Sequence, residues 1–541
     1  MPENKRLNFL WFSFEDTNPF YGCYGDPVAR TPNLDRLAAQ GRIWRNAFST
    51  AGVCAPARSA VITGMYPISI GTHHMRTTHQ NPATPEMPTP YSAVVPHYVK
   101  CFTEYLRAEG YYCTNNVKTD YQFDPPVTAW DELGTSAHWR NRPDPEQPFF
   151  SVFNPTRTHE SGMWEEKCPE PAFDPADMKV PPYFPDTPKV REAMARMYTN
   201  IERSDRHLGE ILAQLEADGL AENTVVFHWS DHGPMPRGKR WPYDSGVRVP
   251  MIVRWPGGLE PGSVTDRLVS TMDLGPTVLS LAGLDIPMHM QGQAFLGERT
   301  APEREYCFMS RDRYDESYDM VRAARDRRFK YIRHMRPDLP YLLWIPYRNR
   351  HPIIQEMWRL HMAGELDEPQ EIMFRPRPVE ELYDTEADPH EIRNLAADPA
   401  RAADLERMRG ALDEWRAQVG DMGEIPESEM VRRWYPNGER PKTAVPVFVP
   451  ICGSSPGIDT SEGGAFEAPV LLQLHCATQG ASIAYTFDGG EKDDKARWLL
   501  YTKPLDLPPG ETTVRAKAIR IGYLESTERA ATFAVEAEGD G

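Results

Sequence analysis

The first half of the chain repeatedly alternates short apolar runs with segments of helical hydrophobic period. This alternation is typical of a mainly parallel sheet with helices on both faces, because parallel strands are usually joined by a helical crossover. We therefore predict an α/β fold. The apolar runs expected as strands are residues 7–14, 111–116, 149–154 and 225–229, and the expected helices include residues 97–110 and a long helix from about Val190.

The 541 residues are too many for one compact core, and changes of composition predict four segments. These are a main α/β part (1–295), a smaller α+β subdomain (296–440), a linker (441–465) and a β-sandwich-like module (466–541). The linker is rich in proline, glycine and serine, whereas the module alternates apolar and polar residues as half-buried strands do. Strands expected after the main part are residues 306–309, 329–332, 470–475, 482–487 and 513–519, and residues 402–419 are expected as a helix.

The formal net charge of -18 argues against partners that need a broad basic surface, so we expect neither nucleic acid nor a membrane to bind. An anionic substrate must then be held by a local cluster of positive groups. The first apolar stretch is too short for a secretion signal, which predicts a cytoplasmic chain, or a periplasmic or secreted one if it has been processed. The eight cysteines are scattered without a CxxC pair, which predicts mostly reduced, buried thiols.

Charged and imidazole side chains follow four of the predicted strands, at the point where each strand ends. In chain order they are Glu15 and Asp16, Lys118 and Asp120, His159, and Asp231 and His232. Ligands of open α/β sheets collect beyond the carboxyl ends of the strands, so we expect these side chains to meet at one edge. An acidic pair after a single strand is usually a cap or a solvated turn. Its recurrence after several strands predicts a metal-assisted hydrolase with Ca²⁺, Mg²⁺ or Mn²⁺.

The run Cys54-Ala55-Pro56-Ala57-Arg58 is followed closely by a Thr-Gly pair. Pro56 preorganises a first helical turn, which places Cys54 at a helix N-terminus where unpaired amides favour an anion. Arg58, in the same turn, adds a planar fork of donors for oxyanions or for the nucleophile itself. A lone cysteine with an arginine four residues later is structural in most proteins, so the complete string is what indicates chemistry.

This string resembles the signature of type I sulfatases, whose cysteine is oxidised to formylglycine. Further segments similar to sulfatase motifs are residues 31–38, 46–48, 230–233, 238–239, 243–250, 381–384, 388–389 and 394–395. The resemblance covers about residues 5 to 420, and the motifs are closest to those of bacterial relatives of heparan N-sulfoglucosamine sulfohydrolase. The last hundred residues resemble the β modules appended to chitobiase-type carbohydrate enzymes, with a structural or dimerising role as open as glycan binding.

The resemblance implies an alkaline-phosphatase-like fold and one bound cation, which in sulfatases is usually Ca²⁺. The ligands that it implies are Glu15, Asp16, Asp231, His232 and the modified Cys54. Glu15 stands where the family more often has a second aspartate.

The resemblance also implies that the enzyme hydrolyses a sulfate monoester, as an arylsulfatase does, through one hydroxyl of the hydrated formylglycine. Arg58 and Lys118 would fix the hydrate, while Lys239 and His159 would face the sulfate and the leaving oxygen. The substrate would be a small-molecule or saccharide sulfate ester. A formylglycine-generating or other sulfatase-maturing enzyme is implied as a partner, and assembly into a homo-oligomer stays open.

One position departs from the family pattern, because Asp120 stands where a histidine usually follows the first catalytic lysine by two residues. His73 and His74 are the nearest candidates in sequence to supply its proton-transfer role, with a surface or supporting role equally open. Two other functions stay open: a phosphodiester or phosphonate monoester hydrolase with the same nucleophile, and an inactive homologue that binds sulfated glycan. The sequence leaves open which alcohol or amine carries the sulfate.

Overall fold

The computed structural model describes residues 6–453, 455–456, 462–487 and 496–536. Within them, the first half of the chain forms a nine-stranded sheet in the order β4-β3-β5-β1-β6-β8-β2-β7, with β9 paired to β2. Its strands are β1 (Asn8–Phe14), β2 (Arg42–Phe48), β3 (Tyr112–Val117), β4 (Glu132–Leu133), β5 (Phe149–Asn154), β6 (Thr224–Ser230), β7 (Arg248–Val249), β8 (Met251–Arg254) and β9 (Ser263–Ser270). The four predicted strands of this half are therefore present as β1, β3, β5 and β6.

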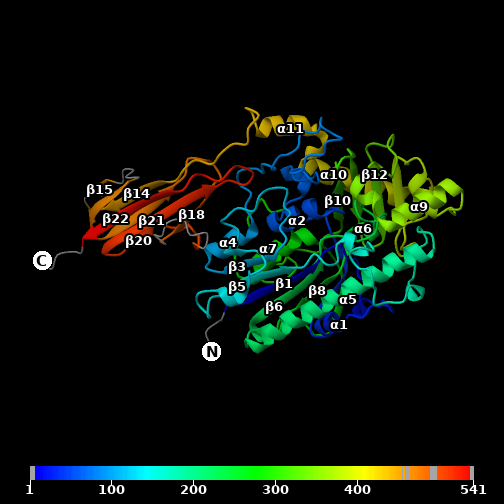
Figure 1. Ribbon diagram of the computed structural model, residues 1–541, viewed down its shortest axis with the longest axis horizontal. Helices are drawn as coiled ribbons and strands as arrows, with labels where there is room; N and C mark the ends of the chain where they lie inside the picture. The colour runs from blue at the N-terminus through cyan, green and yellow to red at the C-terminus, as the bar shows by residue number, and fades with distance from the viewer. Residues whose placement is uncertain (1–5, 454, 457–461, 488–495, 537–541) are drawn as a thin grey trace.

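Helices cover both faces of this sheet, α1 and α5 on one face and α2, α4 and α7 on the other (Figure 1). The helices are α1 (Pro32–Ala39), α2 (Cys54–Thr63), α3 (Pro67–Ile70), α4 (Phe102–Ala108), α5 (Pro188–Ala217), α6 (Asp244–Val247), α7 (Leu274–Leu281), α8 (Pro346–Asn349), α9 (Pro352–Ala363), α10 (Ala402–Val419) and α11 (Glu427–Trp434). Among the described residues, no helix combines the length and apolar character needed to cross a membrane.

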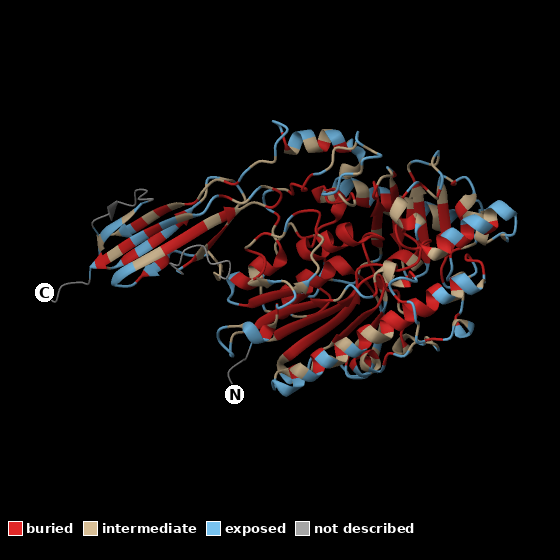
Figure 2. Cartoon of the chain, in the orientation of Figure 1, coloured by how far each residue is buried: buried red, intermediate tan, exposed pale blue. Residues whose placement is uncertain are grey.

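β1 lies at the centre of the sheet, parallel to β5 on one side and to β6 on the other. All of its residues are buried, and alternate side chains enter two different cores. Leu10 and Phe12 belong to the core that contains α1 and α5, whereas Phe9 and Trp11 belong to the core on the other face. Because both faces are covered, β1 is almost entirely apolar in the sequence, apart from Asn8 and Ser13 (Figure 2).

α4 begins later than the predicted helix at residues 97–110. Cys101 has an extended backbone and its N–H donates to the Glu104 carboxylate at 3.1 Å, so the helix starts only at Phe102. This bond satisfies one of the donors that a helix N-terminus leaves unpaired.

Residues 307–384 contribute a separate antiparallel sheet, which agrees with the α+β character expected for this part. Its strands, in order, are β10 (Cys307–Arg311), β11 (Val321–Arg325), β12 (Phe329–His334) and β13 (Glu380–Asp384). α10 packs against it, since Leu412 and Trp415 share a core with Tyr331 and Leu382. The predicted helix at residues 402–419 has the bounds of α10.

The C-terminal part forms two sheets around the core residues Phe448, Leu472 and Phe533, and projects from the end of the main sheet in Figure 1. Its strands are β14 (Val447–Cys452), β15 (Ser455–Pro456), β16 (Gly463–Glu467), β17 (Val470–His475), β18 (Ser482–Thr486), β19 (Leu499–Leu500), β20 (Leu505–Leu507), β21 (Gly510–Ile519) and β22 (Arg529–Glu536). Part of the segment expected as a linker is strand, because β14 pairs with β17 and places Phe448 in the core.

Candidate active site

The parallel pairing of β1 and β6 brings the residues that follow each strand together. The two strands end in register, so Asp16 emerges beside Asp231, and its backbone N–H donates to Asp231 Oδ1 at 3.0 Å. The backbone of Asp16 has a φ of 51°, a left-handed conformation that is costly for residues with a Cβ and is found at functional sites. Both carboxylates are fully buried.

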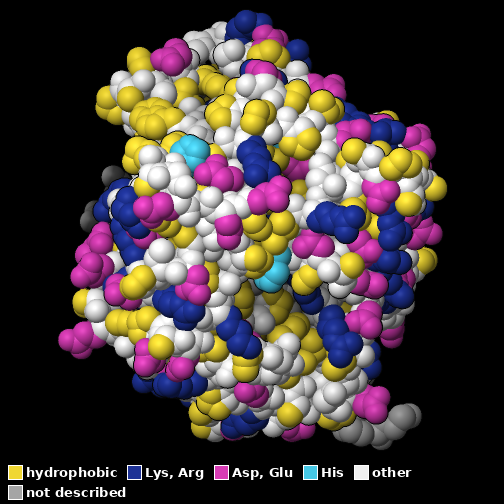
Figure 3. Space-filling view, turned by 90° about the vertical axis from the view of Figure 1, so that its right-hand side faces the viewer, with side chains coloured by type: hydrophobic (Ala, Val, Ile, Leu, Met, Phe, Trp, Pro, Cys, Tyr) yellow, Lys and Arg dark blue, Asp and Glu magenta, His cyan; other side chains and the backbone are white. Residues whose placement is uncertain are grey.

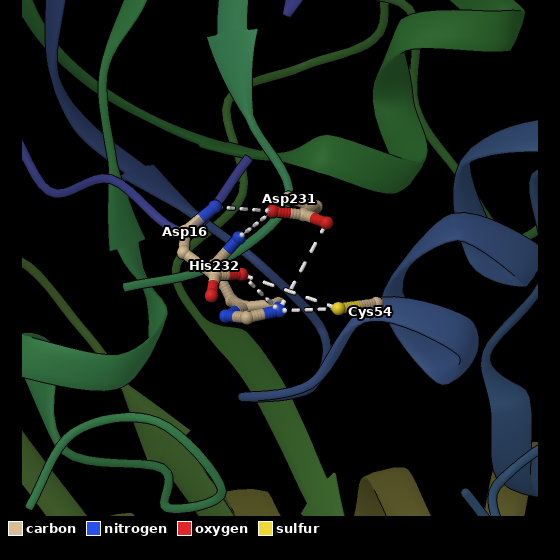
Figure 4. Close-up of side chains that lie close together, drawn as sticks. All are labelled: Asp16, Cys54, Asp231 and His232. Carbon is tan, nitrogen blue, oxygen red and sulfur yellow. Dashed lines mark hydrogen bonds and ion pairs between the residues drawn. The ribbon is translucent and has the colours of Figure 1, made fainter. Parts of the chain in front are cut away.

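Four side chains converge at this edge of the sheet (Figure 4). The ligand atoms of Asp16, Cys54, Asp231 and His232 all lie within 4.8 Å of one another. His232 Nε2 lies 3.2 Å from both Cys54 Sγ and Asp16 Oδ1, and 3.9 Å from Asp231 Oδ2. His232 Nδ1 lies 2.9 Å from the carbonyl oxygen of Gly233, which assigns the proton to Nδ1 and leaves Nε2 able to bind a cation.

A second group of side chains adjoins the first at Cys54. The ligand atoms of Glu15, Cys54 and His159 also lie within 4.8 Å of one another. Glu15 Oε1 lies 3.5 Å from Cys54 Sγ and forms an ion pair with Lys118, while buried Glu15 Oε2 has no hydrogen-bond partner among the described residues. Lys118 Nζ also lies 3.4 Å from Asp120.

Cys54 is the first residue of α2, and only 2 % of it is exposed. Burial raises the pKa of the thiol well above its usual value, and the positive charges of Lys118 and Lys239 only partly oppose this shift. Near neutral pH the unmodified side chain is therefore a neutral thiol. Because the thiolate is the reactive and metal-binding form of cysteine, an unmodified Cys54 is poorly suited to catalysis.

Arg58 lies one turn further along α2 and pairs with Asp231. Its Nε donates to Asp231 Oδ2 at 2.9 Å, and its Nη2 is buried without a hydrogen-bond partner among the described residues. Burial alone would raise the pKa of Asp231, but the neighbouring His232 and Arg58 outweigh burial and hold it below the usual value. Asp231 is therefore a carboxylate that can bind a cation.

Lys239 approaches the cluster from the loop after β6. Its Nζ lies 2.5 Å from Asp16 Oδ2 and 3.2 Å from Glu160 Oε1. Glu160 also accepts two hydrogen bonds from Arg240, at 2.8 and 3.0 Å, and its backbone N–H donates to Asp16 at 2.7 Å. Glu160 and Arg240 were not among the residues predicted from the sequence. The signal that could have found them is their position, because Glu160 directly follows His159 and Arg240 directly follows Lys239.

His159 presents an imidazole of defined tautomer. Its Nδ1 accepts the backbone N–H of Ser161 at 3.3 Å and lies 2.9 Å from the hydroxyl of Ser161, so the neutral ring carries its proton on Nε2. Burial lowers the pKa of His159 to about 3, and the charge of Lys239 adds to the effect. In the substrate-free site the ring is neutral and can donate one hydrogen bond through Nε2.

The structure does not bring His73 and His74 into either group around Cys54. Both are buried with their ring centroids 4.2 Å apart, and His74 Nδ1 accepts the backbone N–H of Arg313 at 3.2 Å. Asp120 does reach the site through Lys118. Where relatives were expected to carry a histidine, this chain places a carboxylate beside the lysine, and a role for His73 or His74 in proton transfer stays a prediction.

The first group of side chains fits a single divalent cation. Ca²⁺ binds oxygen at about 2.3–2.6 Å, so two ligands of one ion are up to about 5 Å apart. The atoms of Asp16, Asp231 and His232 satisfy this limit, and their carboxylates and imidazole suit a hard or borderline ion. The unpartnered oxygen of Glu15 offers one more donor of the same kind.

Family models match three parts of the chain. The model described as Sulfatase matches residues 8–136 and 131–284. The model of the N-sulphoglucosamine sulphohydrolase C-terminal region matches residues 232–343, and that of the chitobiase/beta-hexosaminidase C-terminal domain matches residues 461–530. Together these matches extend from the main sheet into the C-terminal sandwich.

Two curated proteins are similar to most of this chain. An ulvan-active sulfatase of Formosa agariphila is 42 % identical over 97 % of this chain and 91 % of its own length. Human N-sulphoglucosamine sulphohydrolase is 28 % identical over 74 % of this chain and 88 % of its own length.

The solved structures show the fold. A phosphonate monoester hydrolase of Agrobacterium radiobacter superposes with a TM-score of 0.55 at 19 % identity, covering 76 % of this chain and 96 % of its own. A protein in complex with its substrate D-glucosamine-2-N,6-O-disulfate superposes with a TM-score of 0.55 at 18 % identity, covering 78 % and 100 %. The sequence matches and the shared fold lead to one assignment. The chain is an enzyme of the sulfatase family, within the alkaline phosphatase superfamily.

Proposed function

We propose that this protein hydrolyses sulfate monoesters carried by a saccharide, with residue 54 acting as a formylglycine beside one divalent cation. The observation that carries the proposal is the position of Cys54. It begins α2 at the edge of the sheet, 3.2 Å from His232 Nε2 and 4.0 Å from Asp16 Oδ1. A sulfate group held there would meet the nucleophile, the cation ligands and two lysines together.

A formylglycine at residue 54 and a bound cation would supply the hydroxyls and the positive charge that the reaction needs. A hydrated formylglycine supplies one hydroxyl for attack on sulfur and a second through which sulfate is released, which the neutral thiol of Cys54 does not. A cation held by Glu15, Asp16, Asp231 and His232 supplies positive charge near the sulfate oxygens and lowers the pKa of a neighbouring hydroxyl. We propose Ca²⁺ as this ion, with Mg²⁺ and Mn²⁺ as alternatives.

Lys118 and Lys239 provide the remaining positive charge at the site. Burial alone would lower the pKa of both lysines, but the acidic groups around them, Cys54 and then Glu15 beside Lys118 and Asp16 beside Lys239, raise it above its usual value. Both side chains are therefore cations that can donate hydrogen bonds to sulfate oxygens. Fixed donors of this kind lower the barrier most when they are already in place before charge develops.

His159 is the proposed donor to the leaving oxygen. Nε2 carries the proton of the neutral His159 ring. A ring nitrogen of His159 lies within 4.8 Å of Cys54 Sγ and of a carboxylate oxygen of Glu15. A bound sulfate ester brings negative charge close to the ring, which raises the pKa of His159 from its value in the empty site. Protonation of the departing alcohol by His159 is then more favourable with substrate bound than without it.

The burial of Cys54 bears on its maturation. Because residue 54 and the whole of α2 are buried, a maturing enzyme could not reach the thiol in the folded protein. We propose that a formylglycine-generating or other sulfatase-maturing enzyme acts on this segment before the chain has folded.

The substrate class is supported by the relatives. The relative with 42 % identity is named as active on ulvan, and the human relative is named for N-sulphoglucosamine. Both names describe sulfated saccharides. We therefore propose a sulfated saccharide as the substrate of this protein.

The proposed function is tested by comparing kcat/KM for an aryl sulfate and an aryl phosphonate monoester, and by measuring sulfate released from ulvan oligosaccharides. We expect the aryl sulfate to be preferred at least about tenfold and sulfate to be released, with the Cys54→Ala protein as the blank. A preference for the phosphonate would instead identify a phosphonate monoester hydrolase. Binding of oligosaccharide without release of sulfate would identify an inactive homologue.

A further inference from the structure

A cavity of about 440 Å³ lies beside the candidate active site and takes no part in the mechanism described above. Its lining includes Arg76, Asn81, Asp315, Tyr347 and Arg350. These residues come from three separate segments of the chain. We call this feature the arginine cavity.

Tyr347 joins the arginine cavity to the reaction centre. Its ring centroid lies 6.0 Å from that of His159, the proposed donor to the leaving oxygen. The guanidinium of Arg76 also lies over the ring of Tyr347, 4.9 Å from its centroid. A saccharide with its sulfate at Cys54 would therefore extend past His159 toward Tyr347.

A continuous series of ion pairs links the same two places. From Lys239 it passes to Glu160 at 3.2 Å, from Glu160 to Arg240 at 2.8 Å, and from Arg240 to Asp315 at 3.5 Å. The series ends at Arg76, which is ion-paired with Asp315 through Nε. Among the described residues no other side chain forms an ion pair with Arg76, so its two Nη atoms are left for a ligand.

The backbone at this end of the series is in an unusual conformation. Arg76, Arg240 and Asp315 have φ values of 57°, 77° and 52°, in the left-handed region that residues with a Cβ rarely adopt. Residues held in this way cluster at ligand-binding sites, where the surrounding structure fixes them. Arg76 and Arg240 both form ion pairs with Asp315, which restrains the Arg76 side chain.

A second arginine lies along the same wall. Tyr347 contacts Trp164 with ring centroids 5.0 Å apart, and the guanidinium of Arg350 lies 4.4 Å from the centroid of Trp164. Arg350 pairs with Glu166 at 3.3 Å, but both side chains are more than half exposed, so water competes for this pair and a ligand can replace it. Arg76 and Arg350 therefore both line the cavity, Arg76 beside the ring of Tyr347 and Arg350 beside the ring of Trp164 that packs behind it.

The positive charge here is local. The chain carries a net charge of -18, and acidic and basic side chains are intermixed on the face that includes the α9 end of the molecule (Figure 3). Two acidic residues line the cavity. Asp315 is held between Arg76 and Arg240, and Glu316 accepts a hydrogen bond from Asn81 through Oε1, while its Oε2 has no hydrogen-bond partner among the described residues. Exposed guanidinium groups beside aromatic rings bind planar or multidentate anions on a ring-shaped ligand.

We infer that the arginine cavity binds the part of the saccharide beyond the cleaved sulfate, and that Arg76 and Arg350 hold a second anionic group on it. This inference rests on the proposed function, which it makes more specific: the substrate is an acidic saccharide with an anion besides the sulfate that is removed. That anion is a carboxylate or a second sulfate.

The test uses the full-length Cys54→Ala protein, so that binding is measured without turnover. Ligand-observed NMR titrations compare methyl glucuronide, methyl glucoside and methyl glucoside 6-sulfate, which share a ring and differ in one substituent. We expect one of the two anionic sugars to bind at least about tenfold more tightly than the neutral glucoside. A preference for the glucuronide identifies a carboxylate site. The sulfated sugar can also occupy the sulfate position at residue 54, so its preference identifies a second sulfate site only if a substitution of Arg76 or Arg350 removes it. Equal affinities for all three sugars would overturn the inference.

Substitutions then locate the binding. Arg350→Gln removes an exposed charge with little risk to folding, and Arg76→Asn keeps a residue type that tolerates the left-handed backbone. We expect each to remove most of the preference for the anionic sugar. Arg375→Gln is the matched control, because Arg375 is an exposed arginine paired with Glu368 at 3.6 Å and does not line the cavity. An unchanged preference in both cavity variants would contradict the assignment.

The same proteins separate this inference from the proposed function. Turnover of an aryl sulfate is measured on the chain with Cys54 intact. If that chain cleaves the ester while the sugars bind without discrimination, the inference fails and the function stands. If the ester is not cleaved while the anionic sugar is preferred, the function fails and the cavity remains a site for acidic saccharides.

Discussion

Arg58 and Asp231 form a buried ion pair in which Nε lies 2.9 Å from Oδ2. The pair joins the helix that carries residue 54 to the strand end that carries Asp231 and His232. It holds Asp231 in the group of side chains that includes Asp16 and His232, the group proposed to bind one cation. We therefore propose that Arg58 positions the cation site.

Loss of Arg58 should therefore impair the reaction. We expect Arg58→Ala to lower kcat/KM by about 10² to 10³, as the loss of one preorganised donor does at other sites. Steady-state kinetics with an aryl sulfate measure this change. Arg45→Ala is the control, because Arg45 is exposed and pairs with Asp266 at the surface. Equal activity of the two variants would show that Arg58 has no part in the reaction.

The role of His159 depends on the leaving group. If His159 protonates the departing oxygen, His159→Ala should lower kcat by about 10² to 10⁴ for an alkyl sulfate. The loss should be much smaller for an aryl sulfate, whose leaving group departs without a proton. Comparing both substrates on one protein preparation provides the internal control. Losses of the same size for the two substrates would remove this assignment.

Removal of the cation should change both activity and stability. A ligand that binds only the folded state at about 100 times its Kd stabilises by about 2.7 kcal/mol. Dialysis against a chelator should therefore abolish turnover and lower Tm, and added Ca²⁺ should restore both. In Asp231→Asn, which weakens the cation site, Tm should no longer respond to Ca²⁺. A Ca²⁺-dependent rise in Tm that survives this substitution would place the ion elsewhere.

Glu427, which lies outside the active site, should make the free energy of unfolding depend on pH. It accepts hydrogen bonds from Arg313 at 2.6 and 2.7 Å in a buried pair. Burial alone would raise the pKa of Glu427, but His74 and Arg313 lower it from 4.5 to about 2. The folded value is thus the lower one, so the stabilisation is complete above the unfolded value near 4.5 and is lost as pH falls toward 2.

We therefore expect Glu427→Gln to lower the free energy of unfolding by about 3 to 5 kcal/mol near neutral pH, because Arg313 is left buried without its counter-charge. The difference from the unsubstituted protein should shrink as pH falls below about 4.5. Denaturant titrations at several pH values measure it. Glu429→Gln should have little effect, because Glu429 lies on the same helix and pairs with the exposed Arg433. A difference that is independent of pH would show that Glu427 acts by packing alone.

The sequence was informative where a local pattern determines the structure. β1 and β6 are buried on both faces, so they appear as apolar runs, and parallel strands place their carboxyl ends at one edge. Asp16 and Asp231 could therefore be located from strand ends alone. Cys54 was recognisable because a proline two residues later favours the helix start that it occupies.

Other features depend on contacts between distant segments and left no local pattern. Glu160 and Arg240 pair across 80 positions of the sequence, and nothing in either neighbourhood names the partner. The arginine cavity is likewise assembled from loops around Arg76, Asp315 and Tyr347. β14 was missed because prolines made its segment resemble a linker, although pairing with β17 decides its conformation.

The chemical state of residue 54 is the most direct test of the proposed mechanism. Peptide mass analysis of the active, freshly purified protein should show the segment around residue 54 lighter by about 18 Da than its cysteine form, as conversion to an aldehyde requires. Turnover should scale with the fraction of chains so modified and should vanish in Cys54→Ala. Full sulfatase activity from chains that carry only unmodified cysteine would contradict the mechanism.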